Sequence, residues 1–439
     1  MLHPPARTSY DLMLVSVVLG LLAIGLAMVY SASGIKALDA VDDPRYYLIQ
    51  QSAWVAIGLV AMLVVTRIDY HRYRALALPG LVVAILLLIL VLVPGIGTRV
   101  GGASRWLRVS SFAGLQPAEL AKLALVIYLA SWLGRTRQPG STGSTRSARS
   151  ATAAGSAGAE IGRWSVTLPF VLIVGLVAAL VVAEPDLGTA IVLGAVALGM
   201  YFVAGARLVE FAGLGTLAAV LVAGVAVVQP YRLQRILTFL DPWSDPRGAG
   251  FQTIQSIYGL ALGGPFGEGL GAGKEKFGFL PAPYTDSIFA VLGDELGLLG
   301  TLTVVVLFLV IAFKGIRIAL SAPDAMGSLL ATGITVWLVF QAWVNMAVVA
   351  SLVPMTGITL PFISYGGSSI CVGLVAVGIL LNVGHQAVSR AEALAPLPGA
   401  ARGRRDRGTR EPAPRGGRGT GGADRRRASV HRWSSRSRG

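Results

Sequence analysis

The residue with the clearest capacity for chemistry is Asp286, in the segment LPAPYTDSIFAVLGDELG of residues 280–297. It stands where a polar, glycine-rich loop passes into an apolar run that continues to about Phe313. A carboxylate at the mouth of an apolar segment is costly, and such groups are functional candidates by default. Asp286 could act as a general base. Alternatively, Thr285 and Asp286 could cap the helix that follows.

A second group of charges lies in QPAELAKLALVIYLA, where Glu119 and Lys122 are three residues apart and therefore share a helix face. Two interpretations are open. The pair could neutralise itself and hold two helices together, or Lys122 could line a polar cavity and meet an anionic ligand.

Arg105 and Trp106 come just before that helix. Tryptophan is common at membrane interfaces without any function, whereas a guanidinium can bind phosphate bidentately.

In AEPDLGTA, Glu184 and Asp186 occupy a short link between two apolar runs. Asp186 is expected to cap the next helix, which leaves Glu184 as the better functional candidate. The two carboxylates could also act as acid and base, or hold a divalent cation such as Mg²⁺ or Mn²⁺, although no residues are assigned as metal ligands and no resident cofactor is predicted.

The segment 230–286 combines glycines with positive charge from Arg232, Arg235 and Lys276, which could stabilise an anionic ligand. Its GGPFGEGLGAGKEK stretch does not have the spacing of a P-loop, which argues against ATP binding. The glycines would instead let the backbone fold tightly and approach a phosphate-bearing ligand.

Two further polar pairs lie inside apolar runs. Asp294 and Glu295 are expected to need partners such as Lys274 or Lys276, while Gln341 and Asn345 are one helical turn apart and are typical of hydrogen bonding between membrane helices.

The elements that must position these residues are membrane-spanning helices. Hydrophobic residues make up 54% of the 439-residue chain and charged residues 13%, against about 25% charged in soluble domains. Apolar stretches long enough to cross a bilayer recur at 12–31, 48–66, 77–94, 117–133, 166–183, 187–204, 210–229, 287–313, 328–350 and 367–384. The predicted fold class is therefore an all-α polytopic membrane protein of about ten transmembrane helices, with a large extracellular loop between helices 7 and 8.

The distribution of basic residues predicts the orientation. An even number of helices puts both termini on one side, and the positive-inside rule places them in the cytoplasm. Segments 95–116, 184–187 and 230–286 are then external. The predicted domains are a cytoplasmic N-terminus at 1–11, a membrane domain at 12–385 with a cytoplasmic loop at 134–164, and a tail at 386–439.

The tail explains most of the formal charge of +15, because fourteen arginines face four acidic residues between Arg390 and Gly439. Its Gly, Ser and Pro content predicts a disordered basic segment near anionic membrane lipid. Trp433 is its only aromatic residue, so the base-stacking platforms typical of nucleic-acid binding are missing. The single cysteine, Cys371, excludes a disulfide within the chain.

Taken together, these motifs resemble the SEDS family, the polytopic FtsW and RodA proteins of bacterial cell-wall synthesis. The matching stretches follow the family order: RWL at 105–107, QPAELAKLALVIYLA at 116–130, EPDLGT at 184–189, QTIQS at 252–256, GLGAGKEKFGFLP at 269–281, TDSIFAVLGDELGLLG at 285–300 and LPFISYGGSS at 360–369.

The resemblance implies a peptidoglycan glycosyltransferase that polymerises lipid II, a disaccharide-pentapeptide on undecaprenyl diphosphate, at the outer face of the cytoplasmic (inner) membrane. It implies that Asp286 is the catalytic carboxylate of a single inverting displacement. The residues expected to bind substrate are Arg105, Trp106, Glu119, Lys122, Glu184, Arg232, Arg235, Gln255 and Lys276.

The chain departs from the family in the Pro-Glu-Ala-His-Thr-Asp-Phe stretch, where Ala282, Tyr284 and Ser287 replace Glu, His and Phe. A mechanism that needs this histidine as a proton relay is therefore in doubt here. The YSASG, YLASWL and PFISYGGSS stretches look more like the division members of the family than the elongation members. The resemblance then implies a septal location and, as partners, a class B penicillin-binding protein (a transpeptidase) and other divisome proteins.

Three alternatives remain at this stage: an elongation polymerase, a lipid II flippase or transporter, and a non-catalytic divisome scaffold. A transporter should show inverted repeats with helices broken at matching places, and no such repeat is visible in the sequence.

Overall fold

The structure is a computed structural model that describes residues 11–100, 103–108, 114–136, 157–277 and 280–394. Its long helices are α1 (Leu12–Val41), α2 (Tyr46–Thr66), α3 (Tyr73–Leu92), α4 (Pro117–Thr136), α5 (Ala157–Ala183), α6 (Leu187–Val203), α7 (Leu208–Val228), α10 (Ile288–Ser321), α11 (Ala325–Val349) and α12 (Gly367–Leu394). Within the described ranges, nine helices are long and apolar enough to cross a membrane, and α6 is a shorter apolar helix of 17 residues. The predicted polytopic helical fold is confirmed.

The elements between the spans were not specified by the apolar pattern. Segment 95–116 contains an antiparallel sheet of β1 (Gly97–Val100), β2 (Ala103–Arg108) and β3 (Gly114–Leu115), with β2 in the middle. Segment 230–286 contains α8 (Pro230–Leu240), η2 (Pro242–Ser244) and α9 (Phe251–Leu262). The small sheet is an addition to the predicted all-α membrane fold that the apolar pattern did not indicate.

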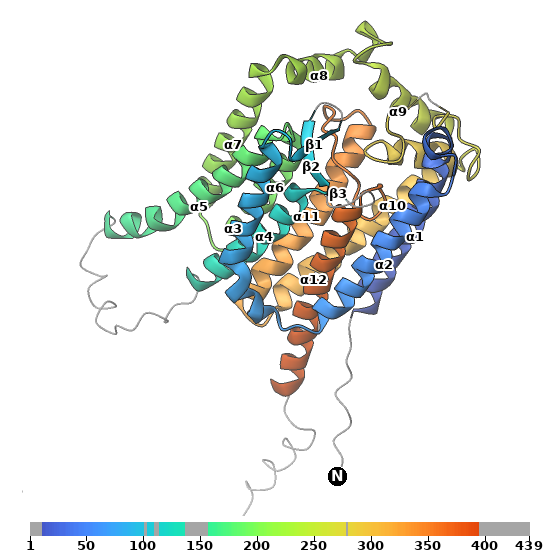
Figure 1. The fold of residues 1–439 in the computed structure, drawn as a ribbon. Helices are drawn as coiled ribbons and strands as arrows, with labels where there is room; N and C mark the ends of the chain where they lie inside the picture. Colours follow the sequence, from blue (N-terminus) through green and yellow to red (C-terminus); the bar gives the residue numbers. More distant parts are fainter. Residues whose placement is uncertain (1–10, 101–102, 109–113, 137–156, 278–279, 395–439) are drawn as a thin grey trace, which may run out of the picture. The chain divides into compact units, whose positions relative to one another are not determined.

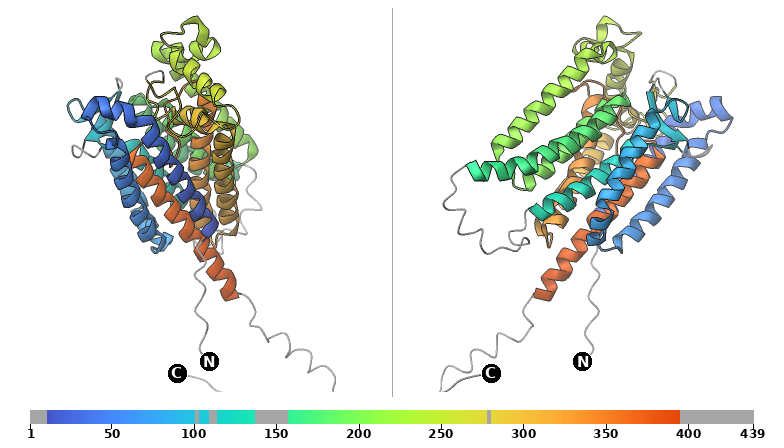
Figure 2. Two further views of the ribbon diagram at one scale, coloured as in Figure 1. Left: turned by 90° about the vertical axis from the view of Figure 1, so that its right-hand side faces the viewer. Right: turned by 60° about the vertical axis from the view of Figure 1, so that its left-hand side comes forward.

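The helices differ in how deeply they are packed (Figure 1). In α4 and α11, 67% of the most apolar window is buried by the rest of the protein, against 6% in α7. α11 packs against α4, α6 and α10. α7 lies at the periphery and leads directly into α8 (Figures 1 and 2). The polar pairs Glu119–Lys122 and Gln341–Asn345 therefore lie on two deeply packed helices, α4 and α11.

One end of the bundle is tied by hydrogen bonds between links and helix starts. Asp11, which caps α1, accepts from Lys314 of α10 at 2.9 Å. His71 of the turn η1 (Tyr70–Arg72) contacts both Asp69 at 2.7 Å and Asp324, the cap of α11, at 2.8 Å. This is the end predicted to face the cytoplasm. The sheet, the α5–α6 link, α8 and α9 lie at the other end (Figure 2).

Helix α10 is broken near its start. Gly297 has φ 66° and ψ −162°, so two intrahelical hydrogen bonds are lost. The glycine-rich loop replaces them: Glu268 and Gly269 donate their N–H groups to the carbonyls of Asp294 and Glu295. In return, the N–H groups of Leu298 and Leu299 donate to the carbonyls of residues 264 and 265. The break is therefore filled by protein backbone, as irregular structure at membrane depth requires.

Two helices extend beyond the predicted domain limits. α12 continues to Leu394, past residue 385, and α5 starts at Ala157, within the predicted 134–164 loop, although its part that could cross a membrane starts at Ser165. The rest of that loop (137–156) and of the tail (395–439) lies outside the described residues.

Candidate active site

Asp286 lies in the turn that leads into α10. The residue at the N-cap position of α10 is Ser287, not Asp286. The half-buried Asp286 carboxylate instead accepts a hydrogen bond from Thr285 Oγ1 at 3.1 Å. Helix capping therefore does not explain this carboxylate.

Helix α11 and the loop that follows it converge on this turn. Asn345 of α11 donates from Nδ2 to the backbone carbonyl of Asp286 and to that of Ile358, both at 2.8 Å. Gly357 has φ 72°, and a Cβ atom added there would lie 4.0 Å from Asp286 Oδ2. The loop after α11 thus runs directly over the carboxylate, and Asn345 binds both segments together.

The pKa of Asp286 is raised, chiefly because burial disfavours the charged form. Hydrogen bonding from Thr285 and Gln252 and the positive charge of Arg235 act in the opposite direction. A base that must accept a proton near neutral pH benefits from a raised pKa. The environment of Asp286 therefore fits proton abstraction.

Helices α8 and α9 supply the groups beside Asp286. Arg235 of α8 donates from Nη1 to the carbonyl of Met355 at 3.1 Å, and Gln252 of α9 donates from Nε2 to Ser287 Oγ at 3.0 Å. Gln252 therefore reaches the turn, whereas the predicted Gln255 lies three residues further along α9.

A cavity of about 280 Å³ opens between α8 and α9. Arg235, Arg247 and Gln252 line it together with Pro281 and Met355. It has polar and basic walls and adjoins the Asp286 turn through Arg235 and Gln252. Its volume is at the lower end of ligand pockets, so it would hold part of a large substrate, such as a phosphate group or one sugar.

Two more arginines are held by the backbone where α5 ends. Arg105 donates from Nε to the carbonyl of Glu184 at 3.0 Å and from Nη2 to that of Pro185, and Arg232 donates from Nη2 to that of Val182 at 3.2 Å. Carbonyls at a helix C-terminus favour positive charge. Because Arg232 also interacts electrostatically with Arg105 and Arg235, the three predicted arginines form one basic cluster.

The two carboxylates of the α5–α6 link have different roles. Asp186 caps α6, accepting from Thr189 N at 3.1 Å and Thr189 Oγ1 at 2.9 Å, so that prediction is confirmed. Glu184 is fully buried, and burial followed by the charge of Asp186 raises its pKa to about 8. Among the described residues no group of three or more metal-binding side chains is placed to hold an ion, so a divalent cation stays a prediction.

Both predicted lysines are engaged in buried ion pairs. Lys122, 2% exposed, contacts Glu119 at 2.8 Å and Gln341 Oε1 at 2.6 Å. Lys276 contacts Glu295 at 2.8 Å, Ser31 Oγ at 2.9 Å and a loop carbonyl at 2.6 Å. These contacts leave Lys276 no donor for a ligand. As predicted, Asp294 is also held by the loop, through the N–H of Lys274 at 2.8 Å.

Aromatic residues complete the site. Trp106 of β2 is half-buried, and a Cβ added at Gly114 of β3 would lie 3.2 Å from its ring. Tyr284 stacks on Tyr47 with ring centroids 4.9 Å apart and contacts Tyr365 edge-on at 5.7 Å. Tyr284 therefore packs in an aromatic cluster beside the Asp286 turn. Neither Gln252 nor this cluster could be recognised from spacing alone, because their partners are distant in sequence.

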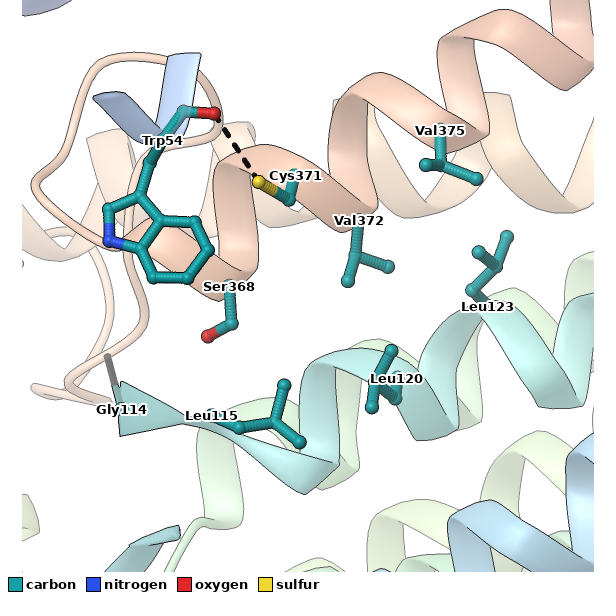
Figure 3. A pocket seen from close by; sticks show the side chains of 9 residues that line it. All are labelled: Trp54, Gly114, Leu115, Leu120, Leu123, Ser368, Cys371, Val372 and Val375. Atoms are coloured by element: carbon teal, nitrogen blue, oxygen red, sulfur yellow. Dashed lines mark hydrogen bonds between the residues drawn. The ribbon is translucent and has the colours of Figure 1, made fainter. Parts of the chain in front are cut away.

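A separate pocket of about 380 Å³ has an apolar lining and lies between α2, α4 and α12 (Figure 3). Leu120 and Leu123 face Val372 and Val375 across it, and Trp54 lies at one end. Such a lining suits a hydrocarbon chain.

Comparison with known proteins gives a consistent result. The model of the cell cycle protein family FTSW_RODA_SPOVE matches residues 11–389. A protein named probable peptidoglycan glycosyltransferase FtsW, from Trichlorobacter lovleyi, is 42% identical over 91% of this chain and 98% of its own. Stage V sporulation protein E of Bacillus subtilis is also 42% identical, over 86% of this chain and 97% of its own.

Solved structures with the same fold are similar over most of their length. A chain from a study of how a peptidoglycan synthase complex coordinates polymerization and crosslinking aligns with a TM-score of 0.66 and 30% identity, covering 86% of this chain and 98% of that one. The rod shape determining protein RodA of Thermus thermophilus aligns with a TM-score of 0.59 and 26% identity, covering 87% and 98%.

Proposed function

Because the chain belongs to the FtsW, RodA and SpoVE family, we propose that it is a peptidoglycan glycosyltransferase that polymerises lipid II, with Asp286 as the catalytic base. The observation that carries the role of Asp286 is its setting. It is a half-buried carboxylate that caps no helix, has a raised pKa, and adjoins a basic cavity.

In the proposed reaction, the carboxylate of Asp286 removes the proton from the attacking sugar hydroxyl. The hydroxyl oxygen forms a bond to the anomeric carbon of a second lipid II molecule while the bond from that carbon to diphosphate breaks. The diphosphate leaves with the bonding electrons, and the proton stays on Asp286. One displacement inverts the anomeric centre, so no second nucleophilic carboxylate is needed.

The basic cluster of Arg105, Arg232 and Arg235 would stabilise the leaving diphosphate. Arginine forks match phosphate oxygens, and charge that is held in place before the reaction stabilises a developing anion. Lys276 and the Glu119–Lys122 pair are given structural roles instead, because their contacts lie within the protein. Trp106 and Gln255 stay candidates for sugar contacts. The apolar pocket beside α4 and α12 would hold part of the undecaprenyl chain.

The relatives favour a role in cell division. Several are named FtsW, and the similarity to a chain of a synthase complex supports a transpeptidase partner of the class B penicillin-binding type. We infer that both act at the septum, with the termini of this chain in the cytoplasm.

The test is polymerisation by purified protein. Wild type and Asp286→Asn are each combined with the transpeptidase partner and lipid II, and glycan strands are separated by length. We expect strands from wild type and a loss of at least about 100-fold in Asp286→Asn, because the base is removed. Asp43→Asn, which changes an exposed carboxylate in the α1–α2 link, is the matched control. Equal strands from wild type and Asp286→Asn would exclude Asp286 as the base.

A further inference from the structure

Glu184 is a buried carboxyl group that the proposed reaction does not use. Its side chain is 0% exposed, and neither carboxyl oxygen has a hydrogen-bond partner among the described residues. Arg105 lies close enough to act on it electrostatically, yet Arg105 donates to the backbone carbonyls of Glu184 and Pro185. Both side-chain oxygens of Glu184 are therefore buried without a hydrogen-bond partner among the described residues.

Arg232 provides a second unsatisfied group in the same place. It is 5% exposed, and its Nη1 atom has no partner among the described residues, while Nη2 is held by Val182. Burying a polar group without a hydrogen bond is energetically unfavourable. Burial and the neighbouring charges of Arg105 and Arg235 lower the pKa of Arg232. An anion bound here would satisfy the free donor and relieve the repulsion between guanidinium groups.

Burial is the largest influence on the protonation state of Glu184, because it disfavours the charged form, and the neighbouring charges modify this influence. Asp186, in the same link, disfavours a second negative charge and is itself bound to Thr189. Arg105 opposes this effect only in part, so the pKa of Glu184 is about 8. At neutral pH the group is therefore mostly a neutral acid, which carries an O–H donor and does not repel an anion.

We propose that Glu184 binds the diphosphate of lipid II as a neutral carboxylic acid, donating its O–H to the anion that Arg105 and Arg232 also hold. This inference rests on the proposed function for the identity of the ligand. It names the third member of the anion site, and it assigns the carboxyl group as a hydrogen-bond donor rather than as a ligand for a divalent cation.

The test measures binding of undecaprenyl diphosphate to detergent-solubilised protein at pH 7 and pH 9, in buffer containing a chelator. All variants carry Asp286→Asn, so that the other carboxyl group of the site does not titrate. With a pKa of about 8, ionisation of Glu184 should weaken binding about tenfold between the two pH values. Adding Glu184→Gln, which keeps a neutral donor, should remove this weakening. Any change in binding that Glu184→Gln still shows between pH 7 and pH 9 reports ionisation of the ligand itself. Glu184→Ala should bind weakly at both pH values.

Two outcomes would overturn the inference. In the first, the binding of undecaprenyl diphosphate to Glu184→Gln weakens between pH 7 and pH 9 as much as binding to its parent. In the second, Glu184→Gln binds as poorly as Glu184→Ala, which would indicate that a carboxylate is required. Glu268→Gln, at an external carboxyl group paired with Lys274, is the control and should follow its parent. Failure of the proposed function can be distinguished from failure of this inference. If the proposed function is wrong, wild type makes no glycan strands in the polymerisation assay, whatever the binding of the Glu184 variants.

Discussion

At the scale of single residues, the proton affinity of Asp286 reflects two opposing influences. Burial raises its pKa, and the positive charge of Arg235 lowers it. A carboxylate acts as a base only when ionised, so polymerisation should fail as the pH falls through the pKa of Asp286. Arg235 therefore contributes to the lower pH limit of activity, together with burial and the hydrogen bonds from Thr285 and Gln252.

Arg235→Gln should move this limit to higher pH, because losing a nearby positive charge raises the pKa of Asp286 further. The measurement is kcat/KM for lipid II as a function of pH. Arg247→Gln is the matched control: Arg247 lines the same cavity but is not among the charges acting on Asp286. If the loss of kcat/KM at low pH occurs at the same pH in Arg235→Gln as in wild type, the electrostatic role of Arg235 is contradicted.

Residue types and spacing predicted the helix cap at Asp186, because a cap depends on residues close together in sequence. They also predicted that Glu295 needs a partner such as Lys274 or Lys276, and the structure pairs it with Lys276. They did not predict that Gln252 rather than Gln255 would reach Ser287, since that choice depends on how α9 lies against α10. The same limit applies to Lys122. The sequence left a structural and a ligand-binding role open, and the contact with Gln341 became visible only once α11 was placed beside α4.

At the scale of elements, the break in α10 and the glycine-rich loop form one structure. A Cβ added at Gly297 would lie 2.3 Å from the backbone N of Gly267, and one added at Gly267 would lie 2.1 Å from the carbonyl oxygen of Glu295. Both glycines have positive φ. The glycines that superficially suggest a nucleotide-binding loop are therefore needed for close packing of two backbones.

Gly297→Ala should destabilise the protein by more than the roughly 1–3 kcal/mol of a strained backbone, because the added Cβ also clashes. Thermal unfolding in detergent measures the effect as a lower Tm. Gly20→Ala in α1, where nothing lies within 4 Å of the added Cβ and φ is not positive, should leave the Tm unchanged or slightly higher. A Gly297→Ala protein as stable as Gly20→Ala would show that the loop and helix are not tightly packed.

The sequence predicted the spans well and their interruptions poorly. Length and hydropathy determine whether a segment can cross a bilayer, and these are local properties. The break at Gly297 depends on hydrogen bonds to residues about 30 positions earlier, and the pairing of β2 with β1 and β3 depends on a fold within a short external segment. Neither leaves a clear periodic pattern.

At the scale of the whole molecule, most of the net positive charge lies in a different part of the sequence from the groups assigned to the reaction. Residues 1–389 hold twenty-three basic and eighteen acidic residues, whereas the rest of the chain carries +10. The family match ends at residue 389, and the groups assigned to the reaction all precede residue 300. The tail is thus not expected to contribute to bond formation.

A protein ending at Leu394 should therefore polymerise lipid II at the full-length rate in vesicles of neutral lipid. In vesicles containing anionic lipid, only the full-length chain gains the attraction between arginines and the membrane surface, about 1 kcal/mol for each residue near the surface. Initial rates in the two vesicle types measure both effects. A slower truncated protein in neutral vesicles would show that the tail supports the reaction itself.

The exchange of hydrogen bonds between the glycine-rich loop and α10 also limits how this protein can change over evolution. Four backbone groups of the loop, from residue 264 to residue 269, each match one group of the helix. Side chains at exposed positions such as Phe266 can vary, because the bonds are made by the backbone. A single inserted or deleted residue would shift every later donor and acceptor out of register. We therefore expect this stretch to keep a constant length among relatives even where its residues differ.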